Sequence, residues 1–116
     1  MKNILLDTSF ILSAIKNKID IFEELIGYNI LIPKQIISEL EGLAKNNPTA
    51  KLAMNIINNK SKINYIQLPG KNTDNAIINY AKENPDILVA SLDREIKNKI
   101  KNMKLIIKGK KKLEII

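Results

Sequence analysis

The stretch NILLDTSFILSAI, residues 3–15, decides the fold class of this chain. Its first part is an apolar run that ends at Asp7, which is typical of a short buried strand. Thr8 or Ser9 follows as the expected cap of a helix with an apolar face. A strand that passes directly into a helix is the repeating unit of open α/β sheets, whose ligands bind outside the carboxyl ends of the strands.

The same alternation continues to the end of the chain. Apolar runs predict further strands at residues 29–32, 63–68, 87–90 and 105–107, with an edge strand at 113–116. Helices are expected between them, at residues 34–44 and 48–59, and from the caps Asp20, Thr73 and Asp93 onward. We therefore expect one α/β domain, residues 1–116, with a parallel sheet of about five strands and helices on both faces.

The composition narrows the chemistry that is available. The chain contains no cysteine and no histidine, which excludes disulfides, thiolate or imidazole metal ligands and a serine–histidine mechanism. The formal charge of +7 suits binding to RNA phosphates, but the abundance of lysine, with Arg94 as the only arginine, also fits a genome-wide composition bias. No apolar run approaches the ~18 residues of a membrane span. The lack of cysteine is compatible with the cytoplasm.

Acidic residues stand where different elements are expected to begin or end. These residues are Asp7, Asp74 and Asp93, and a further candidate acid, Glu39, lies within the helix expected at residues 34–44. Carboxylates gathered in one crevice repel each other unless a cation neutralises them, and hard oxygen ligands suit Mg²⁺ or Mn²⁺. Asp7 and Asp93 could each be a simple helix cap instead, and Asp74 could be placed in a first helical turn by the helix dipole alone.

Periodicity does not choose between two glutamates of the helix at residues 34–44. Leu40 lies at the centre of its apolar face, and Glu39 and Glu41 each fall about 100° to one side of it. From the residues alone either acid can face the crevice, and the other is a solvated surface charge.

Four segments, in this order and spacing, resemble the PIN-domain nucleases. They are LLDTSFIL at residues 5–12, IPKQIISELEGL at 32–43, TDNAIINYA at 73–81 and ILVASLDREIKNKI at 87–100. The resemblance covers nearly the whole chain and is closest to the branch of the small-subunit processome endonuclease and its short archaeal relatives. That branch also has a continuation like SAIKNKIDIFEEL at residues 13–25, a step like Asp93-Arg94 that leads into a basic helix, and a short basic C-terminal strand.

The resemblance implies which residues form the site. It places Asp7, Glu39, Asp74 and Asp93 on the catalytic and metal-binding acids of the family, and so selects Glu39 over Glu41. It also implies that Thr8 and Ser91 support the site. Two positions depart from the pattern: Ser9 stands where asparagine is common, and Asn75 stands where some members carry a second acid.

The function implied by the resemblance is Mg²⁺- or Mn²⁺-dependent hydrolysis of RNA, by an endoribonuclease acting in rRNA processing. The substrate would be an rRNA precursor or a tRNA, with ribosome-assembly factors as partners and a homodimer as a further state that the family allows. Basic side chains would hold the RNA backbone, and the candidates are Arg94, Lys97, Lys101, Lys110 and Lys111.

Other interpretations stay open. The chain could be a VapC-like toxin ribonuclease silenced by an antitoxin, or an inactive PIN domain that serves as an RNA-binding or assembly module. A phosphorylated receiver domain has the same length and alternation. It needs an acidic pair after the first strand and an aspartate after the third, whereas Asp7 has no acidic neighbour and the third strand is followed by Pro69-Gly70.

Overall fold

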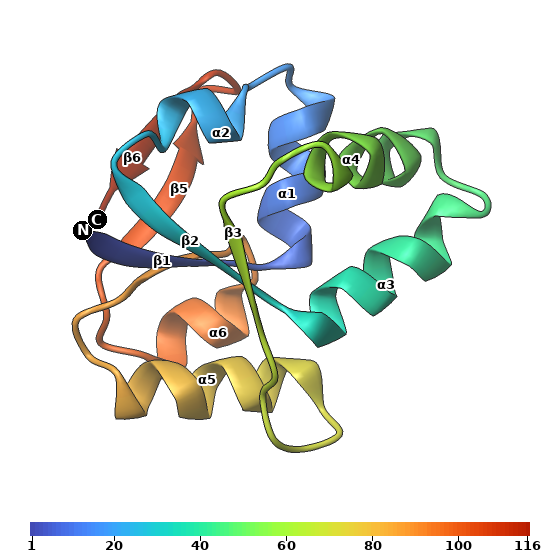
Figure 1. The fold of residues 1–116 in the computed structure, drawn as a ribbon. Helices are drawn as coiled ribbons and strands as arrows, with labels where there is room; N and C mark the ends of the chain where they lie inside the picture. Colours follow the sequence, from blue (N-terminus) through green and yellow to red (C-terminus); the bar gives the residue numbers. More distant parts are fainter.

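The computed structural model describes residues 1–116 and contains a six-stranded sheet with the order β3-β2-β1-β4-β5-β6. The strands are β1 (Lys2–Leu6), β2 (Tyr28–Pro33), β3 (Ile63–Ile66), β4 (Leu88–Ala90), β5 (Lys104–Lys108) and β6 (Lys112–Ile115). The first five pair in parallel, and β6 pairs antiparallel with β5 at one edge (Figure 1). The sheet therefore matches the expected one, and β6 is the edge strand expected at 113–116.

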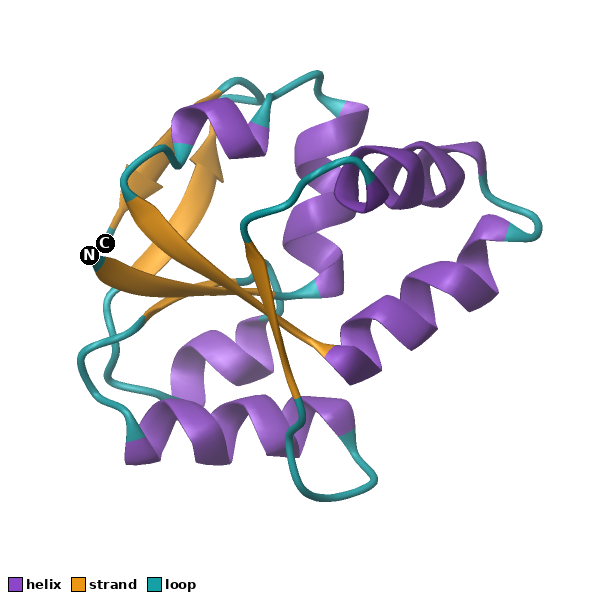
Figure 2. Ribbon diagram, viewed as in Figure 1, coloured by secondary structure: helices purple, strands orange, loops and turns teal.

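Helices cover both faces of the sheet, as expected. They are α1 (Thr8–Lys16), α2 (Ile21–Glu24), α3 (Lys34–Ala44), α4 (Pro48–Asn58), α5 (Thr73–Glu83) and α6 (Arg94–Lys99). Helices α1, α3 and α4 pack against one another, and α5 packs against α6 in a separate layer (Figure 2). None of these helices combines the length and the apolar character needed to traverse a bilayer.

The order in which strands are added to the sheet reverses between β1 and β4, although the two strands are parallel. From β1 the chain runs outward through β2 to β3, and then crosses back to β4 on the other side of β1. Leu6 pairs with Ala90 at the carboxyl ends of these two central strands, and the Asp7 N–H donates to the Ala90 carbonyl at 3.0 Å. The residues that follow β1 and β4 therefore lie side by side at the switch point, where α/β sheets bind ligands.

The central strands are buried because helices cover both faces. Ile4, Leu5 and Leu6 have no exposed surface, and Phe10 and Leu40 of the flanking helices are equally buried. Complete burial of one such side chain contributes roughly 1.5–3 kcal/mol. This core fixes the strand ends, and thereby fixes where Asp7 and its neighbours lie.

Two expected helix caps are wrong by one residue. Helix α1 is capped by Asp7, whose Oδ1 accepts from the Thr8 N–H at 2.8 Å, and not by Thr8 or Ser9. Helix α5 is capped by Asn72, whose Oδ1 accepts from the Asn75 N–H at 2.9 Å, and not by Thr73. In both cases an Asp or Asn precedes the hydroxyl residue, and its side-chain oxygen satisfies a free amide of the first turn.

Candidate active site

Asp7 is a buried carboxyl group with three hydrogen-bond donors around it. Only 5% of the residue is exposed. Its Oδ1 accepts from the Thr8 N–H, and its Oδ2 accepts from the Ser91 hydroxyl at 2.8 Å and the Ser9 hydroxyl at 3.2 Å. Burial raises the pKa of Asp7 above its ordinary value, the hydrogen bonds from Ser91, Thr8 and Ser9 oppose this, and the charge of Glu39 raises it further.

Two serine hydroxyls connect Asp7 to the segment after β4. Ser91 Oγ also accepts from the Asp93 N–H at 3.1 Å, and Ser9 Oγ accepts from the Leu92 N–H at 3.1 Å. Each serine thus uses its hydroxyl as donor to one strand end and as acceptor from the other. In the sequence, Ser9 stands out only as a possible helix cap and as a departure from the family pattern. Its bridging role depends on Leu92, 83 positions away, and carries no local signal.

Asp93 is the N-cap of α6. Its Oδ1 accepts from the Glu95 N–H at 2.8 Å and from the Ile96 N–H at 3.3 Å. The capping interpretation is therefore correct for this residue, but it accounts for one carboxyl oxygen only. Since both amides bind Oδ1, the other oxygen remains available to a ligand.

Glu39 and Asp74 approach the same region from two different helices. Glu39 is exposed on α3, and its Oε2 accepts from the Thr8 hydroxyl at 3.0 Å. Asp74 is half-buried in the first turn of α5. Its pKa is raised by burial first and then by the charges of Asp93, Asp7, Glu39 and Glu95.

Glu95 is an acid near this region to which the sequence assigned no chemistry. It contributes to the raised pKa of Asp74 and pairs with Lys99 of the same helix at 2.8 Å. Glu95 and Lys99 are four positions apart, which is the spacing of a surface ion pair on a helix, so the sequence indicates this pair and no role in the site. Glu41, the rejected alternative to Glu39, is exposed on α3.

The acids lack basic partners within the chain. The only two salt bridges join Lys99 to Glu95 and Lys108 to Glu114, so Asp7, Glu39, Asp74 and Asp93 form none. No three acidic side chains lie close enough together in the structure to hold a metal ion as a set. The chemistry of the donor set nevertheless fits a hard divalent cation, because it consists of carboxylate oxygens that repel one another. Direct binding would need these side chains to converge further, or to contact the ion through waters.

The candidate RNA-binding residues fall into two separate groups. Arg94, Lys97 and Lys101 lie on or just after α6, whereas Lys110 and Lys111 lie in the turn between β5 and β6. Figure 1 places that turn well away from α6. All five side chains are exposed or partly exposed, as solvated charges also are.

The chain is similar in sequence and in fold to known proteins. Residues 4–110 match the family model described as PIN like domain. The chain is 34% identical over 128 aligned positions to Ribonuclease VapC4 of Methanocaldococcus jannaschii, covering 99% of this chain and 97% of that protein. Its fold is similar to the structure of the PIN domain endonuclease Utp24, with a TM-score of 0.81, 22% identity, and coverage of 97% of this chain and 90% of that one.

Proposed function

The chain belongs to the PIN-like domain family, and from this premise we propose that it is an endoribonuclease, which hydrolyses phosphodiester bonds of RNA at the switch point between β1 and β4. One observation carries the proposal. Asp7, Glu39, Asp74 and Asp93 come from four different elements, and Asp74 is near enough to the other three for their charges to raise its pKa. None of the four has a basic partner in the chain.

A divalent cation, Mg²⁺ or Mn²⁺, is the group that this donor set would hold. Asp7, Asp74 and Asp93 would bind it, with Glu39 as a further ligand or as the residue that orients a water molecule. A bound ion of this kind lowers the pKa of a water and neutralises charge on phosphoryl oxygens. With no cysteine or histidine in the chain, hydrolysis by water is the simplest route to RNA cleavage.

Neighbouring residues orient these acids. The Ser91 and Ser9 hydroxyls donate to Asp7 Oδ2, and the Thr8 hydroxyl donates to Glu39 Oε2. These hydrogen bonds fix the orientation of the two carboxylates. Hydrogen bonds to metal-binding side chains commonly set ligand orientation in this way. RNA would be held through phosphate contacts by residues of the two basic groups, Arg94, Lys97, Lys101, Lys110 and Lys111.

For the biological role we infer rRNA processing, with an rRNA precursor as substrate and ribosome-assembly factors as partners in the cytoplasm; a tRNA substrate belongs to the toxin alternative. The second candidate is a toxin ribonuclease paired with an antitoxin, and the 34% identity to Ribonuclease VapC4 favours it. An inactive RNA-binding module is less well supported, because all four acids are present. Either active form could act as a homodimer.

Cleavage of a structured RNA by the purified protein tests the activity. We expect cleavage with Mn²⁺ or Mg²⁺ and none after chelation. Asp93→Asn is an informative variant, because asparagine caps a helix as well as aspartate does but carries no charge. It should fold normally and lose cleavage, whereas Glu41→Gln, which alters an exposed acid of α3, should cleave as the wild type does.

Cleavage that persists in the chelator, or in Asp93→Asn, would refute the metal-dependent mechanism. The biological role needs a different measurement, namely the mapping of new RNA 5′ ends in cells that lack or overproduce the protein. Ends within rRNA precursors in normal growth support processing. Ends in tRNA or mature rRNA that arise only on overproduction, and vanish when a neighbouring small gene is co-expressed, support the toxin.

A further inference from the structure

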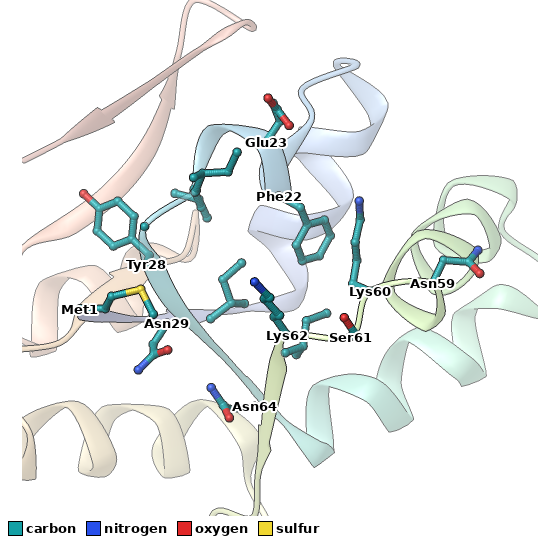
Figure 3. A pocket seen from close by; sticks show the side chains of 15 residues that line it. Met1, Phe22, Glu23, Tyr28, Asn29, Asn59, Lys60, Ser61, Lys62 and Asn64 are labelled. Carbon is teal, nitrogen blue, oxygen red and sulfur yellow. The ribbon is translucent and has the colours of Figure 1, made fainter.

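One hollow of the molecule lies away from the acids. It has a volume of about 620 Å³ and opens between α2, the start of β2 and the segment that joins α4 to β3 (Figure 3). Sites for small molecules commonly measure about 300–1,000 Å³. The hollow lies at the amino ends of β2 and β3, whereas the acids follow the carboxyl ends of β1 and β4. Strands of this length separate the two regions by roughly 17–20 Å.

One wall of this hollow is aromatic and aliphatic. Phe22 of α2 is half-buried and points its ring toward the opening, as Figure 3 shows. Leu25, Ile30 and Ile63 continue the apolar wall, and Tyr28 stands at the start of β2. A flat, partly apolar group can bury its faces against such a wall, as nucleobases do against aromatic side chains.

The rim of the hollow is positively charged. Lys60 and Lys62 both line it, and Glu23 is the only acid that does so. Neither lysine forms a salt bridge, and Lys60 Nζ lies 5.6 Å from the centre of the Phe22 ring. A cation held over an aromatic ring is kept beside the apolar wall instead of moving freely in solvent. Many lysines of this basic chain are exposed, but these two border an aromatic-lined hollow.

A second hollow continues from the first. It measures about 350 Å³, lies between α2 and α4, and shares Phe22 and Lys60 with the larger one. The two hollows therefore meet at an aromatic ring with an ammonium group above it.

We propose that the larger hollow binds a nucleoside phosphate, with the base against Phe22 and Ile63 and the phosphate on Lys60 and Lys62. The site is independent of the proposed ribonuclease activity, since no residue is shared between the two. The same chemistry is offered by a free mononucleotide and by one nucleotide of single-stranded RNA. In the second case the hollow holds the strand at a fixed distance from the acids.

Nuclear magnetic resonance of the isotope-labelled protein tests the site directly. Adenosine monophosphate, adenosine and an adenosine hexanucleotide of RNA are titrated without divalent metal, and amide shifts are followed at Phe22 and Ile63. We expect saturable shifts there with the monophosphate, and weaker ones with adenosine. Lys60→Gln combined with Lys62→Gln should weaken binding by about tenfold or more, equivalent to ~1.4 kcal/mol. Lys51→Gln, an exposed lysine of α4 outside both hollows, is the matched control and should change nothing.

The relative affinities identify the source of the ligand. Binding of the hexanucleotide at least about tenfold tighter than the monophosphate indicates an RNA strand, and equal affinities indicate a free nucleotide. The proposal is overturned if neither the monophosphate nor the hexanucleotide causes saturable shifts of the Phe22 and Ile63 amide resonances. It is also overturned if the double lysine variant binds as well as the Lys51→Gln control. Neither result bears on cleavage, which Asp93→Asn tests separately.

Discussion

Ser91 Oγ donates a 2.8 Å hydrogen bond to Asp7 Oδ2 across the switch point of the sheet, joining residues 84 positions apart. Both groups are buried, and both follow the carboxyl ends of paired central strands. The bond favours the ionised form of a carboxyl group whose burial favours the neutral form. It therefore favours the charged form of an acid that we propose as a metal ligand, in a place where the surroundings disfavour that charge.

Replacing Asp7 with asparagine should remove activity and leave the fold intact. Asparagine retains an oxygen for the Thr8 N–H and no longer places a buried charge at this position. We expect RNA cleavage to fall more than roughly 100-fold, since an acid proposed to bind the metal is removed. Without metal at neutral pH the melting temperature should not fall. A variant that fails to fold would instead assign Asp7 a structural role, through the oxygen that accepts from the Ser91 and Ser9 hydroxyls.

Replacing Ser91 with alanine should affect Asp7 through its titration. The variant removes the donor to Asp7 Oδ2 and the acceptor of the Asp93 N–H, which should cost about 1–3 kcal/mol of stability. Because the hydrogen bond from Ser91 lowers the pKa of Asp7, that pKa should rise further without it. Carboxyl resonances of the metal-free protein measure it. A destabilised variant with an unchanged Asp7 titration would show that Ser91 has a structural role only.

How far the sequence predicts this molecule depends on whether the signal is local. Helix α3 has the predicted bounds Lys34–Ala44, because its start after Pro33 and its apolar spacing lie within the segment itself. Helix α4 begins at Pro48 as predicted, and its cap Asn47 accepts from the Thr49 N–H at 2.9 Å. The caps of α1 and α5 were wrong by one position, because neighbouring Asx and hydroxyl residues cap equally well by propensity.

The arrangement of the site depends on interactions that local patterns do not contain. The choice of Glu39 over Glu41 needed the family resemblance, and in the structure Glu39 contacts Thr8, 31 positions away. The bridging role of Ser9 had no signal at all, because it arises only when Leu92 is brought beside α1. Apolar spacing predicted helix α4 but does not show which of its apolar side chains are covered, and Leu52 of this helix is 50% exposed.

The stability of the metal-free protein should fall as the pH rises through the folded-state pKa values of Asp7 and Asp74. Both pKa values are raised above 3.8, so the folded state holds more protons than the unfolded state just above that pH. The stability that the protonated Asp7 and Asp74 contribute is fully present below pH 3.8, and it is lost as the two groups ionise in the folded state. Thermal melts from pH 3.5 to 8 measure this loss. Asp7→Asn combined with Asp74→Asn should flatten that part of the curve, and an unchanged slope would contradict the assignment.

Divalent cations should reverse that loss. Mn²⁺ or Mg²⁺ binds ionised carboxylates, so the gain in melting temperature should be large at neutral pH and small near pH 4. Asp93→Asn should reduce the gain without lowering the melting temperature in chelator, because its cap to the Glu95 and Ile96 amides is retained. A gain that does not depend on pH would indicate that the ion binds elsewhere.

The two glutamates of α3 should behave differently. Glu39→Gln keeps an oxygen for the Thr8 hydroxyl but removes one charge that raises the pKa of Asp74. We expect cleavage to fall about 10–100-fold, in the range seen when groups around a metal site are altered. Glu41→Gln should leave cleavage unchanged. Equal losses in both variants would mean that α3 contributes a general negative field and no specific ligand.

The turn between β5 and β6 should contribute to RNA affinity and not to the chemical step. Leu105 pairs with Ala90, so β5 continues past the end of β4 and carries Lys110 and Lys111 beyond it. Replacing both lysines with glutamine should weaken binding of single-stranded RNA and reduce the slope of log K against log salt by about 1.4, or ~0.7 for each phosphate that a lysine no longer neutralises. The cleavage rate at saturating RNA should stay constant. Lys51→Gln combined with Lys82→Gln, which removes two exposed lysines of α4 and α5, controls for net charge, and an equal change in slope in that variant would assign the effect to the overall charge of the protein.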